Sequence, residues 1–417
     1  MDRNPFYCNV NRLKSCENTS KRPRILYVTS HNPCGPVYGA QMRVFRIGKI
    51  LQRLADVSLV LMVTEAVDAD CLQQTRQQFD LRAVIPVKTL PRTISSRFQH
   101  ELDPKYFGMR GQTFASHDKN LFLKLSRDYD LIWFHTVRIP DAIGQFRWKR
   151  SILDVDDLAS QLYDSKAKVQ QSPLWRLLDR RMKYIWQRRE RLFLKRFDIL
   201  CVCSEIDRKL FNNPSRVYVV RNGFETVSGG GPAEIDPVAP RLGFIGGLNY
   251  SPNREGIEWF IKKVLPLIKT SFPALKLRLV GTDTDGGIST LGADIDGLGR
   301  IEDVGYEIST WSAMIVPIRQ GGGTRIKVAE GFARRCPVIA TSVGAYGYEI
   351  ENGKEALIAD DPVAFSRACV AVLCEPDLRR KLTDNAFYAF SQRYTWEAQE
   401  KSIFKAVNHC LRLATHF

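Results

Sequence analysis

The sequence lacks a long apolar segment and the glycine pattern of a simple nicotinamide enzyme. Its apolar runs are only as long as strands, LVLMV at 59–63 for example, and none approaches the length of a membrane span. Residues 1–20 are polar and irregular, without the apolar core of a signal peptide, so we expect a flexible extension over 1–21. The loop CGPVYGAQMR (34–43) contains no G-x-G-x-x-G.

Paired cysteines are also missing. The ten cysteines include no Cys-x-x-Cys pair, and Cys201 and Cys203 lie in the apolar run ILCVCS, where two buried thiols are a sufficient explanation. A metal or redox site would need such pairs together with nearby histidines, so we expect no metal. This cysteine usage fits a reducing, cytosolic setting.

Acidic residues are outnumbered, because 61 Lys and Arg face 45 Asp and Glu and leave a net charge of +16 at pH 7. Such an excess predicts an anionic partner, namely nucleic acid, an anionic membrane or a phosphorylated substrate. No motif interleaves the charge with a groove-reading pattern, so we expect no nucleic acid. The length of 417 residues predicts two or three domains.

The first half of the chain alternates short apolar runs with helical patterns. A run at 24–30 is followed by a loop, by apolar residues at helical spacing over 40–55, and by a second run at 57–63. This is the order of a parallel βαβ unit. Further strands are expected at 82–87, 131–135, 151–155, 198–204 and 216–220. Residues 22–225 are therefore predicted to form one Rossmann-like domain.

A segment dense in Gly and Pro at 226–240 is typical of a linker, and a second α/β series follows over 241–395. Its strands are expected at 241–247, 276–281, 312–318, 337–342 and 356–360, and its helices near 254–269, from 324, and at 362–374 and 377–392. The last segment, 396–417, is expected to be a helix that packs back toward the first domain. The predicted fold class is α/β, with two doubly wound Rossmann-like domains facing one another across a deep cleft.

One stretch carries most of the chemistry, IRQGGGTRIKVAEGFARRCPVIATS at 318–342. It follows a predicted strand and enters a helix, which is where ligands bind in open α/β sheets. Three glycines permit close backbone approach, Thr324 can cap the helix, and Arg325 and Lys327 can bind phosphate oxygens. Glu330, one turn beyond Lys327, can accept hydrogen bonds from a diol such as ribose. The alternative is a glycine loop before a solvated basic helix, but the combination favours a nucleotide diphosphate site.

The motif KVAEGFA (327–333), followed by PVIATS (337–342) and Gly344, resembles the donor site of retaining glycosyltransferases of the GT-B type, family 4. The resemblance covers about residues 22–400 and includes GFIGGLNYSPNREGIEWF (243–260). It implies transfer of a hexose-type sugar from a nucleotide diphosphate sugar to a hydroxyl of a growing glycan or lipid-linked saccharide. It further implies retention of configuration with no metal or other cofactor, as in a polysaccharide-biosynthesis subgroup.

The resemblance also implies roles for particular residues. Glu330 would bind the ribose, and Arg325 and Lys327 would neutralise the diphosphate and serve catalysis. The other donor-binding candidates are Gly39, Ala40, Gly246, Gly247, Asn249, Arg254, Gly322, Gly323 and Thr324.

Two positions depart from the family pattern. A glutamate is common eight positions before Glu330, where this chain has Gly322, so backbone N–H groups of the glycine run are expected to meet the sugar hydroxyls. The usual arginine of the first loop in the second domain is replaced near Gly247, and Arg254 stands for its lysine partner.

Polar residues also end two strands of the first domain. His135 ends LIWFH and is either a hydrogen-bonded histidine at a strand end or a catalytic contact to the donor sugar. Asp154, Asp156 and Asp157 surround the end of the next strand, and we interpret them as candidates for holding acceptor hydroxyls.

The segment 171–197 interleaves arginines with apolar residues at helical spacing. It is either a helix packed on the core or a basic amphipathic surface that meets anionic lipid, and the pattern favours some membrane contact. We therefore expect a cytoplasmic protein, peripheral on the inner face of the membrane. The functional alternatives are a nucleotide-sugar epimerase of the same fold and a non-catalytic scaffold that binds a sugar nucleotide or a membrane.

Overall fold

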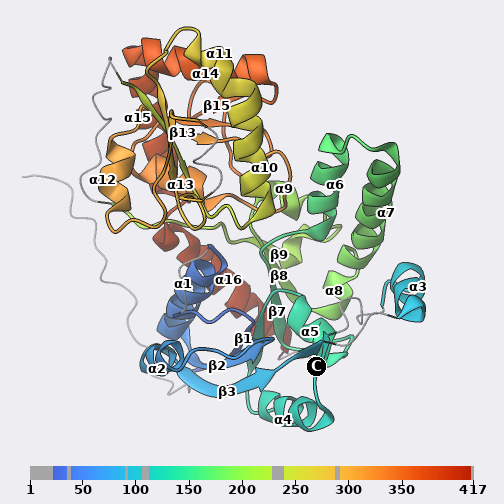
Figure 1. Cartoon of the computed structure of the whole chain (residues 1–417). Coiled ribbons are helices and arrows are strands. Elements are labelled where there is room, and N and C mark those ends of the chain that lie inside the picture. Colours follow the sequence, from blue (N-terminus) through green and yellow to red (C-terminus); the bar gives the residue numbers. More distant parts are fainter. Residues whose placement is uncertain are drawn as a thin grey trace, which may run out of the picture.

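The computed structural model describes residues 22–34, 39–89, 93–105, 112–227, 239–286 and 292–414. These residues form two α/β domains, each built on a parallel sheet covered by helices (Figure 1). The predicted fold class is therefore confirmed. The expected extension 1–21 and most of the expected linker 226–240 lie outside the described residues.

The first sheet has seven parallel strands in the order β3-β2-β1-β6-β7-β8-β9. The strands are β1 (Arg24–Thr29), β2 (Asp56–Val63), β3 (Asp80–Pro86), β6 (Leu131–His135), β7 (Ser151–Val155), β8 (Ile199–Val202) and β9 (Val217–Val219). Every residue of β6 and β7 is buried, because helices cover both faces of the sheet. Continuous apolar runs are the sequence signature of such strands, which is why all seven were predicted. A short antiparallel pair, β4 (Lys88–Thr89) and β5 (Gln112–Thr113), was not predicted from the sequence.

The second sheet has six parallel strands in the order β12-β11-β10-β13-β14-β15. They are β10 (Arg241–Ile245), β11 (Lys276–Val280), β12 (Ile295–Gly297), β13 (Ala313–Val316), β14 (Val338–Ala340) and β15 (Leu357–Ile358). The edge strand β12 was not predicted, because its three-residue segment IDG has only one apolar side chain.

Helices cover both sheets. In the first half these are α1 (Gly39–Leu54), α2 (Ala69–Gln78), α3 (Ile94–Leu102), α4 (Ser116–Ser126), α5 (Arg138–Ile143), α6 (Ala159–Val169), α7 (Pro173–Glu190), α8 (Phe193–Arg196) and α9 (Glu205–Arg208). In the second half they are α10 (Ser251–Trp259), α11 (Leu265–Lys269), α12 (Val304–Ser309), α13 (Ile326–Ala333), α14 (Pro362–Cys374), α15 (Pro376–Arg393) and α16 (Trp396–Ala414). A π-helical turn (Phe260–Val264) joins α10 to α11, and a 3-10 turn (Pro214–Arg216) precedes β9.

The last helix leaves the second domain and lies on the first. Trp396, Ile403 and Val407 of α16 are buried in one hydrophobic cluster with Ile25 and Trp133 of the first sheet. In Figure 1 the red α16 accordingly lies beside the blue α1. The chain thus passes between the domains twice, after β9 and before α16.

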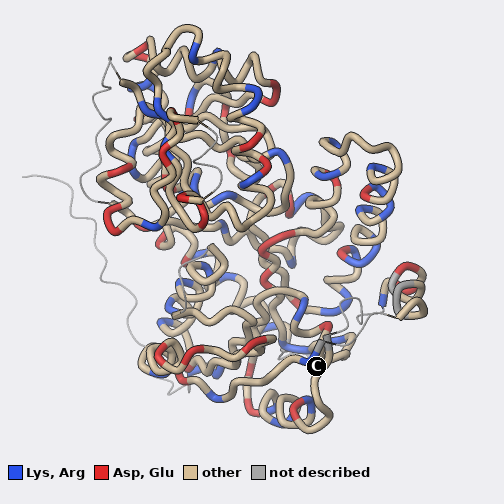
Figure 2. Tube along the Cα trace, viewed as in Figure 1, with Lys and Arg blue, Asp and Glu red and all other residues tan. Residues whose placement is uncertain are grey.

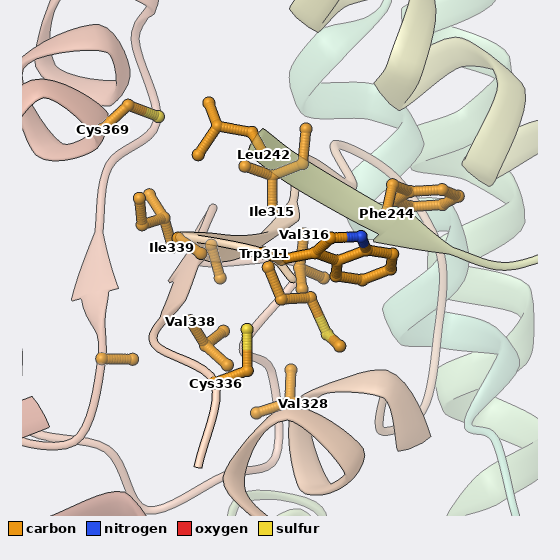
Figure 3. Packing of buried hydrophobic residues seen from close by; sticks show 14 of the residues in the cluster. Leu242, Phe244, Trp311, Ile315, Val316, Val328, Cys336, Val338, Ile339 and Cys369 are labelled. Atoms are coloured by element: carbon orange, nitrogen blue, oxygen red, sulfur yellow. The ribbon is translucent and has the colours of Figure 1, made fainter. Parts of the chain in front are cut away.

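The core of the second domain is built around Trp311, which is 1% exposed. Figure 3 shows the indole among side chains of the sheet and of α13, including Phe244, Val316 and Val328. Gly243 of β10 lies directly beneath the ring, and a Cβ at this position would overlap the indole carbons. Glycine is therefore required here for packing.

Gly243→Ala is expected to lower the free energy of unfolding by about 1–3 kcal/mol, because the added methyl forces Trp311 out of its position. Gly292→Ala is the matched control, since its Cβ would meet only Ile295 Cδ1 at 3.9 Å. Denaturant unfolding followed by tryptophan fluorescence measures both variants. Equal stabilities would show that the core adapts to a side chain at 243.

Candidate functional site

The carboxyl edges of the two sheets meet at the junction between the domains. There α1 begins at Gly39 in the first domain and α13 begins at Ile326 in the second. The two helix starts are in contact, since a Cβ on Gly39 would lie 2.9 Å from Ile326 Cδ1. Because a helix N-terminus carries partial positive charge, two of them converging favour an anion at this junction.

The glycine triplet contacts the first domain. The N–H of Gly321 donates to Ser165 Oγ at 2.8 Å, and this hydroxyl donates to the Gly321 carbonyl at 3.1 Å. A Cβ on Gly322 would lie 3.3 Å from the Leu158 carbonyl oxygen, and Gly323 has a φ of +67°. The triplet is thus free of side chains partly because the loop before α6 and α6 itself lie against it.

Thr324 does not cap α13, and this prediction is wrong. Arg325 occupies the N-cap position without a side-chain cap, whereas Thr324 Oγ1 accepts a hydrogen bond from Asn222 Nδ2 at 2.9 Å. Asn222 belongs to the first domain, just after β9. A further bond between the domains runs from the Tyr346 hydroxyl to Asp207 Oδ1 at 2.7 Å. Thr324 therefore connects the domains.

Arg325 and Lys327 are neighbouring basic side chains at the start of α13. Arg325 is 9% exposed and donates through Nη1 to the Gly323 carbonyl at 3.0 Å, while its Nε and Nη2 have no hydrogen-bond partner. Lys327 Nζ donates to Asn253 Oδ1 at 3.0 Å, and burial together with nearby Arg325 lowers the pKa of Lys327 well below its usual value. Neither cation forms an ion pair within the described ranges. Two desolvated cations side by side would be stabilised by a bound anion.

The loop after β10 lies against Lys327. Gly246 has a φ of +146°, and a Cβ there would lie 2.9 Å from Lys327 Nζ and from Asn253 Nδ2. Asn253 Nδ2 also donates to the Gly247 carbonyl at 2.8 Å. The structure therefore brings Gly246 and Gly247 together with Lys327, as a phosphate cradle requires.

The remaining donor-binding candidates lie around this cradle. Asn249 is exposed, and so is Arg254, whose Nε donates to the Leu248 carbonyl at 2.9 Å. Glu330 is 9% exposed and accepts from Arg334 Nε at 3.1 Å. Burial raises the pKa of Glu330, and Arg334 opposes this shift.

His135 and Asp154 belong to a fully buried network. Asp154 accepts from Arg43 Nε at 3.0 Å and from Arg43 Nη2 at 2.5 Å, and its Oδ2 lies 3.0 Å from His135 Nδ1. Burial by itself would raise the pKa of Asp154, but Arg43 and His135 hold it at about 2. Asp154 is 0% exposed and both its oxygens are occupied, so the expectation that it holds acceptor hydroxyls is not supported.

The same network orients His135. An ionised Asp154 can only accept, so it selects the imidazole tautomer that carries its proton on Nδ1. The other ring nitrogen, Nε2, is buried and has no hydrogen-bond partner in the described part of the chain. The ring is thus held in a fixed orientation, with its Nε2 lone pair buried.

A cavity of about 290 Å³ opens in the first domain beside these residues. Ala40, Asp156 and Asp157 line it, together with His31 and Thr136. Its other wall is formed by side chains of α6, α7 and α8, among them Leu162, Trp186 and Phe193. A cavity with apolar walls and converging polar groups is suited to a small organic ligand.

Arg43, Thr136 and His31 were not predicted from the sequence. Thr136 is a β-branched residue with a φ of 70° and a buried hydroxyl without a partner, and backbone strain of this kind is concentrated at functional sites. Burial lowers the pKa of His31 to about 4, with a further contribution from His135. Thr136 and His31 both follow strands at the carboxyl edge, so the rule that selected His135 would have found them.

Arg43→Met is expected to destabilise the protein by about 3–5 kcal/mol, because it leaves Asp154 charged and unpaired in the core. The double variant Arg43→Met/Asp154→Leu should lose less than Arg43→Met alone. The control is Arg53→Met on the same helix, where the exposed pair with Glu400 at 2.8 Å contributes under about 1 kcal/mol. Thermal denaturation measures all three; a double variant less stable than the single would contradict the expectation.

Comparison with known proteins agrees with this architecture. The profile of the family glycosyl transferases group 1 matches residues 239–375. A Klebsiella pneumoniae protein, described as an uncharacterized 44.6 kDa protein in the cps region, is 26% identical over 172 residues, which cover 39% of this chain and 44% of that protein. The chain therefore matches less than half the length of this curated relative.

Solved structures align with nearly the whole chain. Sucrose-phosphate synthase from Thermosynechococcus elongatus has a TM-score of 0.63 at 17% identity, covering 94% of this chain and 100% of that one. HepE from Anabaena, in complex with UDP and glucose, has a TM-score of 0.59 at 12% identity, covering 93% and 100%. S. aureus TarM has a TM-score of 0.63 at 9% identity, covering 93% and 100%. The second domain thus matches the profile of the glycosyl transferases group 1, and the chain as a whole has the GT-B fold.

Proposed function

We propose that the protein is a glycosyltransferase that moves a hexose-type sugar from a nucleotide diphosphate sugar to an acceptor hydroxyl of a growing glycan or lipid-linked saccharide. One observation carries the proposal: Arg325 and Lys327 lie where two helices begin and have no counter-ion among the residues that the structure describes. A diphosphate would neutralise both cations and accept from the exposed helix N–H groups. Glu330, one turn further along α13, would accept from ribose hydroxyls.

The chemistry follows from the charge that develops during transfer. The bond between the anomeric carbon and the diphosphate breaks with its electrons going to phosphate, and Arg325 and Lys327 stabilise that negative charge. The acceptor oxygen then bonds the anomeric carbon, and its proton passes to the departing phosphate on the same face. This route retains configuration and uses no metal and no enzyme nucleophile. His135 Nε2 would accept from a sugar hydroxyl, and Asp156 would face the acceptor.

The similar proteins support this assignment. HepE was solved with UDP and glucose and with UDP-glucose, and TarM with UDP and a GlcNAc-glycerol. The Klebsiella relative lies in a cps region, which supports a role in polysaccharide synthesis.

A thermal-shift screen tests the donor assignment. UDP, GDP and ADP, each with and without an attached hexose, should include at least one pair that raises the melting temperature. Lys327→Ala and Glu330→Ala should each weaken this binding or turnover at least tenfold. No stabilisation by any of these ligands would overturn the proposal.

Product analysis separates the alternatives. A changed sugar nucleotide released without acceptor would indicate an epimerase, and binding without any turnover would indicate a scaffold.

The proposal extends to a membrane-bound partner. The segment 171–197 is broken at Arg191–Leu192 into α7 and α8, and its two halves differ. Ile185 and Trp186 are buried, whereas Trp175 and Leu177 are 59% and 64% exposed. Basic residues recur along the same helix, as Figure 2 shows. The core interpretation thus holds for the end of α7, and a free surface exists at its start.

A neighbouring helix enlarges this surface. Ile94, Phe98 and Leu102 of α3 are 75%, 60% and 73% exposed and recur every four residues, on one helix face. Arg181 of α7 pairs with Glu101 of α3, so the two helices are adjacent. No helix in the described segments is long and apolar enough to cross a membrane. From the exposed apolar residues of α3 and α7 and the basic residues along α7, we assign this surface to an anionic bilayer on the cytoplasmic side, where a lipid-linked acceptor would be found.

Liposome flotation tests this surface. Arg180→Glu/Arg181→Glu should lower binding to phosphatidylglycerol vesicles tenfold or more, since each basic residue near the surface contributes about 1 kcal/mol. Trp175→Ser/Leu177→Ser should lower it as well. The control, Lys262→Glu/Lys263→Glu, makes the same charge change at exposed positions of the second domain. Equal binding of the unmodified protein to anionic and neutral vesicles would contradict the assignment.

A further inference from the structure

The acidic side chains that line the cavity of the first domain differ in whether other protein groups hydrogen-bond or ion-pair with them. Three of the four are engaged by protein groups: Glu190 by Ser160 at 2.9 and 2.5 Å, Asp141 by Arg196 at 2.7 Å and Asp156 by Asn222 at 3.1 Å. Asp157 has no hydrogen bond and no ion pair among the described residues. It is therefore the one acid of the cavity, within those ranges, with both oxygens available to a ligand.

Asp157 also touches the second domain. A Cβ on Gly323 would overlap Asp157 Oδ1, so the carboxylate lies directly against the glycine triplet while it lines the cavity. It remains accessible to solvent, although protein atoms crowd around it. Burial, and then the charge of Asp156, raise the pKa of Asp157 to about 7, against the opposing effect of Arg325. Such a group would be stabilised by hydroxyl donors, and the residues that the structure describes supply none.

Arg325, Asp157 and the cavity of the first domain lie near one another at the junction. Arg325, with unpartnered Nε and Nη2 groups, lies on the second-domain side of the triplet and is 9% exposed. Asp157, from the first domain, lies against the triplet at Gly323, and the cavity continues from Asp157 into the first domain. If the diphosphate binds Arg325 and the acceptor enters the cavity, the sugar being transferred must lie between them. Asp157 occupies that intermediate place.

We infer that Asp157 binds hydroxyl groups of the transferred sugar and so helps to determine which sugar is accepted. The inference rests on the proposed function. The triplet offers the sugar only backbone groups from the second domain, and a carboxylate from the first domain supplies the acceptor atoms that a hydroxyl needs. A site built to hydrogen-bond a hydroxyl discriminates strongly against a ligand that lacks it. Sugar recognition would then depend on both domains being in contact.

The test compares a nucleoside diphosphate with its sugar. For whichever of UDP, GDP or ADP the screen identifies, Asp157→Asn should lower kcat/KM for the sugar nucleotide at least tenfold. The Kd of the bare diphosphate, measured by calorimetry, should change less than twofold. Asp164→Asn is the matched control, because this aspartate of α6 pairs with Lys168 and Lys183 on the surface and should leave both values unchanged.

Deoxy analogues of the sugar nucleotide show whether the contact is direct. Removal of the bound hydroxyl should reduce kcat/KM in the unmodified protein and cause little further loss in Asp157→Asn. An equal loss of sugar-nucleotide and diphosphate binding would mean that Asp157 acts through phosphate charge, and this outcome would overturn the inference. Unchanged kinetics, or independent losses for every analogue, would overturn it as well. If the unmodified protein binds no diphosphate at all, the proposed function itself fails, which is a distinguishable result.

Discussion

The buried ion pair between Arg43 and Asp154 holds together the elements that form the junction. Arg43 comes from α1 and Asp154 from β7, and the pair fixes His135 at the end of β6. Arg43 also donates to Asn222 Oδ1 at 2.9 Å, and Asn222 in turn donates to Thr324 of the second domain. An apolar pair of equal volume would fill the same space at no great loss of stability. The ion pair adds a fixed relative orientation of these elements, because each lone pair and each N–H has one assigned hydrogen-bond partner.

Strand positions were predictable because a strand buried on both faces needs a largely apolar run, and LIWFH and SILDV are mostly apolar. Positions at strand ends followed from the same logic, which is how His135 was found. The role of Asp154 was not predictable, since DVDD looks the same whether an acid points into a cavity or toward an arginine 111 residues away. The glycine triplet posed the same difficulty. Its sequence predicts a backbone that permits close approach, but it does not predict that Asp157 lies against it.

The helix at α7 shows a second limit of periodicity. Apolar side chains at helical spacing mark one face, but the pattern does not state how far the covering element extends. Here α6 packs along α7 and Ile185 and Trp186 are buried, while Trp175 near the start of the same helix is exposed. Only the arrangement in space separates a core face from a free one. The helix is also interrupted at Arg191–Leu192, between α7 and α8, and no glycine or proline there predicts the interruption.

The path of the chain gives the second domain two attachments to the first. One follows β9, where a Cβ on Gly223 would lie 2.9 Å from the Trp396 ring, and the other precedes α16, where Thr395 pairs with Phe224. The two connections therefore run side by side. Topologically the second domain is an insertion between a strand and a helix of the first domain, joined to it by two adjacent connections. Two adjacent connections permit the second domain to twist and bend about this one point. Such a motion would change the distance from Asp157 to the triplet together with the distance from Asn222 to Thr324.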